Sequence, residues 1–296
     1  MYKKTEDNLH KFEKQDKFLF LNLFALDKTF KMEKKYQEMI ENRDLQIKKF
    51  DFQSDSAKTT EKLNKIVEEK TCGKIQNLFE QDLGSDTRFV LLNVLYFKSP
   101  WLDEFGRIGK SDFKLANGNI KKVPFMKLSD SEGIKYFQKD DFSIVQIPFK
   151  SNENSFYLTI LVPDNDDADI KNYISNMRYI ASTWFARVDI RMPLFKFAQT
   201  HKLKKILQKM GLTELLGNNP DLSEICCEKI KIDKFVQKAT IAIDEKGGEA
   251  AAATRKRIVF SCITRVISLN ITRPFIFTIR EHQTATDLFT GIVYDP

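Results

Sequence analysis

The segment that most constrains the fold runs from Asp244 to Cys262 and reads DEKGGEAAAATRKRIVFSC. Its four alanines favour helix, but about one turn of helix is too short to nucleate by itself. The flanking stretches, KIDKFVQKATIAIDE and VISLNITRPFIFTIR, are rich in Val, Ile and Thr and predict strands. A run of small residues that begins at the flexible pair Gly247 and Gly248 therefore joins two strands. This composition predicts a loop that can itself become a strand.

The composition fits a chain with a sizeable core. The 296 residues are 42% hydrophobic and include 25 phenylalanines, enough for one large or two ordinary domains. The net charge of +7 arises from 48 cations and 41 anions that are well mixed along the chain. We therefore expect a solvated basic surface and no nucleic-acid partner. A polyanion-binding patch is the alternative, but no compact basic stripe with interleaved aromatic residues supports it.

The cysteine spacing predicts no metal or cofactor site, and the apolar runs predict no membrane-spanning segment. Cys72, Cys226, Cys227 and Cys262 form no Cys-x-x-Cys pair, and the fold does not need disulfides, which leaves the compartment open. The longest apolar run, residues 18–26, is too short to span a membrane. The first seven residues are not a signal peptide, so the protein is intracellular or this chain lacks its natural beginning.

No enzyme motif is present in the sequence. The chain has three histidines, and it contains no Gly-x-Ser-x-Gly elbow, P-loop or His-Glu-x-x-His. The acidic turn PDNDDAD at 163–169 does not have the spacing of an EF-hand. We therefore expect that the chain is not an enzyme and binds no metal ion.

Local patterns predict strands at 18–26, 45–52, 89–97 and 188–197, and helices at 32–42, 54–75, 170–186 and 202–211. Ser56 is the expected cap of the second helix and Gly73 its expected end. Asn117-Gly118 predicts a hairpin turn among the alternating short strands of residues 113–162. Residues 89–97 are almost all apolar and predict a central strand, in which we expect the amide of Asn93 to bond neighbouring backbone.

The loop segment carries a family pattern: Glu, any residue, Gly, a small residue, Glu, a run of Ala, then Thr. In this chain the pattern is Glu245-Lys246-Gly247-Gly248-Glu249, followed by Ala250 to Ala253 and Thr254. It resembles the reactive-centre loop of the serpins. The segment NVLYFKSPW that ends at Trp101 is similar to that family's Asn-x-x-Tyr-Phe-Lys-x-x-Trp strand, and the last 24 residues are similar to its terminal segment. The resemblance covers nearly the whole chain.

The resemblance implies an α+β fold with a large mixed sheet, further β-sheets and surrounding helices. It implies a single serpin-like domain over residues 1–296, truncated at its N-terminus so that it lacks the family's first helices, with the reactive-centre loop at 244–265. The expected state is a monomer. The expected location is extracellular by family resemblance, with a cytoplasmic location as the alternative.

Inhibitory serpins act as suicide substrates, and the resemblance implies the same activity here. The expected partner is a serine-type endopeptidase, chymotrypsin- or elastase-like by the residues Phe260-Ser261. The family's loop register places the reactive bond at Ser261–Cys262; a slipped register would bring in Arg257 or Arg265 and a trypsin-like enzyme. The implied breach and shutter residues are Trp101, Asn93 and Gln237. The implied loop hinge consists of Glu245, Gly247, Gly248, Glu249, Ala250, Ala251, Ala252, Ala253 and Thr254.

Features of the loop and of the sheet favour an alternative. Lys256 would point inward from an inserted strand, where an unpaired ammonium is costly. Gln237 stands where the family often has a histidine, and Gly248 replaces the usual Thr or Ser. The alternative prediction is a non-inhibitory or inactive, truncated serpin-like binding protein.

Overall fold

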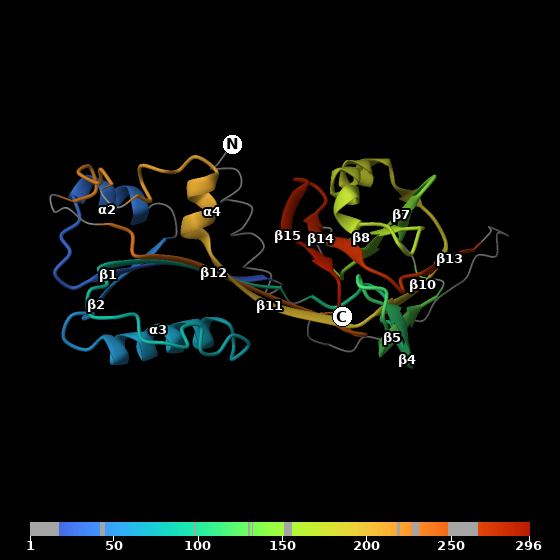
Figure 1. Cartoon of the computed structure of the whole chain (residues 1–296), viewed down its shortest axis with the longest axis horizontal. Coiled ribbons are helices and arrows are strands. Elements are labelled where there is room, and N and C mark those ends of the chain that lie inside the picture. Colours follow the sequence, from blue (N-terminus) through green and yellow to red (C-terminus); the bar gives the residue numbers. More distant parts are fainter. Residues whose placement is uncertain are drawn as a thin grey trace. The chain divides into compact units, whose positions relative to one another are not determined.

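A computed structural model of the chain describes residues 18–41, 45–97, 99–129, 131, 133–150, 156–217, 220–226, 231–247 and 266–296. The chain divides into two compact units (Figure 1). The first unit is drawn from residues 1–97 and 197–241, and the second from residues 98–196 and 242–296.

The first unit is built on a five-stranded mixed sheet with the strand order β11-β12-β3-β1-β2. β1 pairs antiparallel with β3, whereas β2 runs parallel to β1 and β12 runs parallel to β3. In Figure 1, α3 lies along one face of this sheet, and α2 and α4 lie on the other. The elements are β1 (Phe18–Asp27), α2 (Lys34–Glu41), β2 (Gln46–Phe50), α3 (Ser56–Lys70), β3 (Phe89–Phe97), β11 (Phe195–Lys202), α4 (Leu203–Lys209) and β12 (Lys234–Ile243).

β3 is a central strand, as its apolar run predicts. Its alternate residues Leu92 and Val94 are buried in a cluster with Leu63 and Val67 of α3. The spacing of four between those two helix residues places both on one helix face, and the period of two in the strand turns its alternate side chains toward that face. The pairing of an amphipathic helix with an apolar strand thus buries the core of this unit.

The ends of α3 differ from the sequence expectation. Asp55, not Ser56, is the N-cap, because the Asp55 carboxylate accepts a hydrogen bond from the Lys58 N–H at 3.0 Å. Ser56 instead donates its hydroxyl to Asp82 at 2.6 Å. The helix ends at Lys70, and Gly73, with φ of +75°, donates its N–H to the carbonyl of Glu68. Gly73 therefore closes the C-terminus, as predicted, a few residues after the helix itself has ended.

The second unit contains two sheets, a four-stranded one with the order β13-β10-β5-β4 and a six-stranded one with the order β15-β14-β8-β7-β6-β9. Together with the mixed sheet and its helices, these confirm the predicted α+β class. The elements are β4 (Gly106–Lys114), β5 (Ile120–Leu128), β6 (Lys135–Lys139), β7 (Phe142–Pro148), β8 (Phe156–Pro163), the 3₁₀ helix η1 (Ile170–Ser182), β9 (Trp184–Phe185), β10 (Val188–Pro193), β13 (Ile267–Asn270), β14 (Phe275–Glu281) and β15 (Thr286–Val293).

Local patterns predicted one turn of this unit well and two boundaries poorly. β4 and β5 form a hairpin whose turn contains Gly118 at φ +84°, as Asn117-Gly118 predicts. The expected helix over residues 170–186 is a 3₁₀ helix that stops at Ser182, because the next residues pair with β6 as β9. The single strand expected at 188–197 is two strands, β10 and β11, which belong to different sheets.

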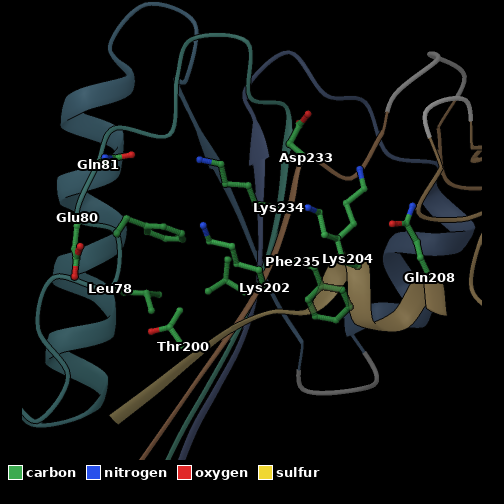
Figure 2. Close-up of a pocket in the computed structure, with 13 residues that line it drawn as sticks. Leu78, Glu80, Gln81, Thr200, Lys202, Lys204, Gln208, Asp233, Lys234 and Phe235 are labelled. Atoms are coloured by element: carbon green, nitrogen blue, oxygen red, sulfur yellow. The ribbon is translucent and has the colours of Figure 1, made fainter. Parts of the chain in front are cut away.

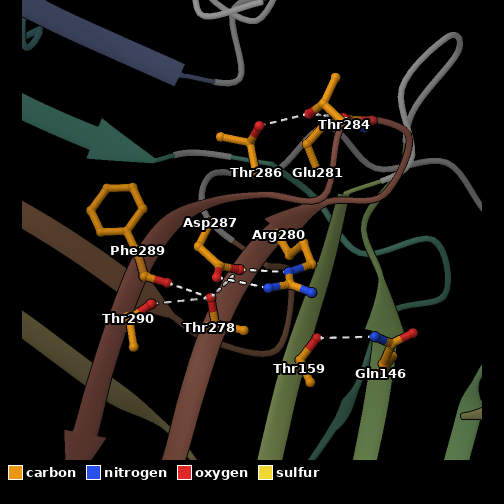
Figure 3. Close-up of polar contacts among 10 residues, drawn as sticks. All are labelled: Gln146, Thr159, Thr278, Arg280, Glu281, Thr284, Thr286, Asp287, Phe289 and Thr290. Atoms are coloured by element: carbon orange, nitrogen blue, oxygen red, sulfur yellow. Dashed lines mark hydrogen bonds and ion pairs between the residues drawn. The ribbon is translucent and has the colours of Figure 1, made fainter. Parts of the chain in front are cut away.

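A row of polar side chains crosses the six-stranded sheet. Lys135, Gln146, Thr159, Thr278 and Thr290 stand directly opposite one another on five successive strands. Figure 3 shows the bonds from Gln146 to Thr159 and from Thr278 to its neighbours on β15. The adjacent row on the same face is apolar and packs in part on η1. A slip of one residue between two strands would move the side chains of one strand to the opposite face of the sheet. The polar row and the apolar row therefore specify the register together.

Candidate functional site

Three amide side chains form a row across the mixed sheet. Asn93 of β3 stands opposite Asn22 of β1 and opposite Gln237 of β12. Asn93 donates its amide N–H to Asn22 Oδ1 at 2.6 Å, and Gln237 donates to Asn93 Oδ1 at 2.8 Å. Each amide is half-buried. The row therefore links three neighbouring strands through side chains as well as through the backbone.

The partners of Asn93 differ from the expectation. We expected its amide to bond neighbouring backbone, but its partners are the side chains of Asn22 and Gln237. The implied shutter residues Asn93 and Gln237 thus touch each other, whereas Asn22 was not anticipated as part of the site. A signal for Asn22 existed: FLFLNLFAL and FVLLNVLYF are both apolar runs with one asparagine at the fifth position.

β12 and β3 pair directly, with no strand between them. Eight consecutive residue pairs run from Lys234 with Val90 to Ile241 with Phe97 in a parallel ladder. Parallel pairing of strands that lie far apart in the sequence depends on the fold rather than on a local turn. The polar pair of Asn93 and Gln237 lies in the middle of this ladder.

Trp101 contacts the turn at residues 244–247 that follows β12. Trp101 and this turn both belong to the second unit. The Trp101 side chain is 1% exposed, and its indole N–H donates to the carbonyl of Asp244 at 2.8 Å. The ring stacks on Phe149 with 4.4 Å between ring centroids. The backbone N–H of Trp101 donates to the carbonyl of Lys246 at 3.1 Å. A buried aromatic with its one donor satisfied is a rigid anchor.

Gly247 closes this turn and lies against the chain before Trp101. Its φ is +103°, in the left-handed region that favours glycine. A Cβ at this position would lie 2.3 Å from the carbonyl oxygen of Ser99 and 2.8 Å from the backbone N of Trp101. Gly247 also exchanges backbone hydrogen bonds with Asp244, each at 3.2 Å. The structure therefore requires glycine at 247 for close backbone approach as well as for φ.

The acidic residues of the turn are anchored too. The Glu245 carboxylate forms an ion pair with Arg107, with 2.9 Å between Oε1 and Nε. Its backbone carbonyl accepts a hydrogen bond from the N–H of Phe105 at 2.9 Å. Burial raises the pKa of the Asp244 carboxyl and outweighs the opposing effect of the Lys246 N–H that it accepts. The first two predicted hinge residues, Glu245 and Gly247, are thus both held in place.

The remaining loop residues that the sequence singled out lie outside the described residues. These include the predicted reactive bond Ser261–Cys262 and the alternative bait residues Arg257 and Arg265. Seven of the predicted hinge residues also lie outside the described part of the chain: Gly248, Glu249, Ala250, Ala251, Ala252, Ala253 and Thr254. The chain is described again from Val266, which leads into β13.

No side-chain arrangement for metal chemistry occurs in the described part of the chain. Within it, no group of three or more His, Cys, Asp or Glu side chains is placed to hold a metal ion. Of the two described cysteines, Cys72 is exposed and Cys226 is buried. Among the described residues, no helix has the length and apolarity needed to cross a membrane.

Comparison with known proteins decides the family. The model of the family described as Serpin (serine protease inhibitor) matches residues 1–296. The chain belongs to the serpin family. The family's description is of protease inhibitors rather than enzymes, in agreement with the sequence prediction.

The relatives agree on the serpin fold. A curated relative, the alpha-1-antitrypsin homolog of Cyprinus carpio, is 34% identical over 245 residues, which are 80% of this chain and 64% of that protein. The chain thus spans less than two thirds of that relative's length. The crystal structure of Serpin48 from Tenebrio molitor has a TM-score of 0.82 at 29% identity and covers 98% of this chain and 79% of that one. AtSerpin1 of Arabidopsis, described as a native stressed conformation, has a TM-score of 0.80 at 22% identity and covers 94% and 76%.

Proposed function

We propose that the chain inhibits a serine-type endopeptidase as a suicide substrate, with Ser261–Cys262 as the reactive bond. Family membership and one structural observation support this proposal. β12 lies directly beside β3, and the chain runs from β12 through the anchored turn at Gly247 into the loop segment. The loop therefore leaves the strand beside which it would insert.

The proposed reaction begins with attack on the loop. The protease serine attacks the carbonyl carbon of Ser261, the peptide bond to Cys262 breaks, and the new amino group of Cys262 leaves with a proton. The Ser261 carbonyl remains as an ester on the protease. Insertion of the freed segment between β3 and β12 would then carry the acylated protease along, which is a documented form of strand addition and release of strain.

The hydrogen bonds gained on insertion of the loop supply a driving force for it. Insertion replaces the parallel ladder between β12 and β3 by two antiparallel ladders, because the segment turns back after β12. This adds about a dozen hydrogen bonds at roughly 0.5–1.5 kcal/mol each. The amide row must change partners in this process, because the Gln237 donor and the Asn93 acceptor would be separated. In the proposed mechanism, the hydrogen bonds of the row stabilise the closed sheet, in which β3 pairs with β12.

The bait residues suggest the partner. Phe260-Ser261 favours a chymotrypsin- or elastase-like enzyme, and Arg257 or Arg265 would favour a trypsin-like one if the register slips. We further propose an extracellular location, which rests on the family alone.

A second candidate function is a serpin-like protein that proteases cleave without being trapped. The anchored turn favours it, because the Arg107–Glu245 ion pair and the bonds between Gly247 and Asp244 resist insertion of the first loop residues. Lys256, which would face inward, also slows insertion. A slow insertion gives the protease time to hydrolyse the ester and leave.

Denaturing gel electrophoresis separates the two functions. The chain is incubated with chymotrypsin, elastase and trypsin in turn, and the products are identified by mass. We expect a band at the summed mass that survives SDS with chymotrypsin or elastase. The matched variant Ser261→Pro, which blocks cleavage at the proposed bond, should abolish that band. Cleavage at Ser261 or in residues 255–257 without such a band would leave only the substrate function.

A further inference from the structure

A cavity in the first unit combines an apolar floor with a lysine rim. It has a volume of about 790 Å³, within the range of about 300–1,000 Å³ that is usual for small-molecule sites. Leu78 and Phe79 line one side, and Phe235 and Val236 of β12 line the other. Figure 2 shows that the side chains of Lys202 and Lys234 extend from the strands toward the segment that carries Glu80 and Gln81.

The charges around the cavity are unbalanced. Asp233 accepts the backbone N–H groups of Arg88 and Phe89, and Lys204 donates to the carbonyl of Ile232. Those two side chains therefore have structural partners.

The other three lysines of the rim differ in this respect. Lys202, Lys205 and Lys234 form no ion pair within the part of the chain that the structure describes, and Glu80 is the only remaining carboxylate among the described lining residues. Neighbouring ammonium groups without a counter-charge repel one another. A bound anion would relieve this repulsion.

Both walls of the cavity are fixed in advance. Asn64 of α3 donates to the carbonyl of Phe79 and accepts from the N–H of Phe79, both at 2.9 Å. The opposite wall belongs to β12, which pairs with β3 along eight residues. A site that is ordered before binding loses little conformational entropy when a ligand arrives.

From this combination we propose that the cavity binds a small amphiphilic anion, of the chemical class of a medium- or long-chain carboxylate. The apolar body would cover Leu78, Phe79 and Phe235, and the acidic group would contact Lys202 and Lys234. An inorganic anion would leave the apolar floor exposed, and a neutral lipid would leave the ammonium groups unpaired. The bound ligand would join the segment after α3 to β12 and thereby stabilise the first unit.

Calorimetric titration of the full chain with decanoate, kept below its micelle concentration, tests the proposal. We expect saturable binding with one ligand per chain and a rise in melting temperature. Decanol and inorganic sulfate serve as the tail-only and head-only probes, and each should bind at least tenfold more weakly. Equal binding of sulfate would reduce the cavity to a plain lysine patch and overturn the proposal.

Two variants locate the site. Lys202→Gln combined with Lys234→Gln should weaken decanoate binding tenfold or more, because charge-assisted contacts are lost. Thr200→Trp, at an exposed position on the cavity wall, should block binding by filling the space while every lysine is kept. Lys48→Gln combined with Lys49→Gln makes the same charge change at exposed positions of β2 and should leave binding within twofold of the parent chain. Decanoate binding that is unchanged in both cavity variants, or that never saturates, would overturn the proposal.

Discussion

At the scale of single residues, Gly247 is the glycine, among those that the structure describes, that leaves least room for a side chain. Replacement by alanine would place a Cβ 2.3 Å from the Ser99 carbonyl oxygen in a backbone with φ of +103°. We expect Gly247→Ala to lower the free energy of unfolding by about 3 kcal/mol or more, since steric overlap adds to the left-handed cost of about 1–2 kcal/mol. Urea unfolding followed by tryptophan fluorescence measures the change.

Gly109 provides the matched control. It also has a positive φ, +86°, but no atom lies within 4 Å of a Cβ built there. Gly109→Ala should therefore cost only about 1–2 kcal/mol. Equal losses for the two variants would show that the approach of Gly247 to Ser99 has no energetic consequence. The sequence predicted glycine at 247 for its freedom, whereas the contact with a distant segment could be known only from the fold.

Asp27 carries the clearest pH dependence. It is fully buried and accepts hydrogen bonds from Thr29, Phe52 and Gln53. Burial pushes the pKa of Asp27 upward, but these hydrogen bonds outweigh it and hold the pKa below its ordinary value. Stability from this carboxylate is therefore present above the unfolded pKa of about 3.9 and is lost as the pH falls through the lower folded pKa.

We expect Asp27→Asn to lower the unfolding free energy at pH 7 by about 1–3 kcal/mol, because its partners lose a charged acceptor. The decline of stability on acidification should become shallower in the same variant. Unfolding in urea across a pH series measures both effects, with Asp86→Asn at an exposed position as the control. A pH profile that is parallel to that of the parent chain would contradict this assignment.

At the scale of elements, the amide row couples β1, β3 and β12. Asn93→Leu leaves both Asn22 and Gln237 without their partner and should cost about 2–3 kcal/mol, whereas Gln237→Leu removes one hydrogen bond and should cost about 1 kcal/mol. The triple change of Asn22, Asn93 and Gln237 to leucine should be more stable than Asn93→Leu alone, since no amide then lacks a partner. Strictly additive losses in thermal unfolding would rule out this coupling.

The elements themselves were largely predictable, and their pairing was not. Apolar runs predicted β1 and β3 within a residue, because a strand buried on both faces needs a continuous run. The opposition of Asn22 to Asn93 depends on register across a long separation, which local patterns do not report. The lysine-rimmed cavity was missed for the same reason: Lys202 and Lys234 come together only through the pairing of distant segments. The sequence predicted β10 and β11 as one strand, because the residues where β10 ends and β11 begins are apolar.

At the scale of the whole molecule, the family pattern predicted more than local propensity could. The α+β class with a large mixed sheet followed from three serpin-like segments and agrees with the observed sheets. The reactive bond stays a prediction, because it lies outside the described residues.

The proposed inhibition requires the pairing of β3 with β12 to open and admit the cleaved loop. The most direct test is to cleave the chain once within residues 255–262 with a limiting amount of protease. The melting temperature of the cleaved chain is then compared with that of the intact chain. Insertion should raise the melting temperature by more than about 10 °C, given about a dozen added hydrogen bonds and a few degrees per kcal/mol. An unchanged or lower melting temperature after cleavage would mean that the sheet stays closed, and would contradict the claim.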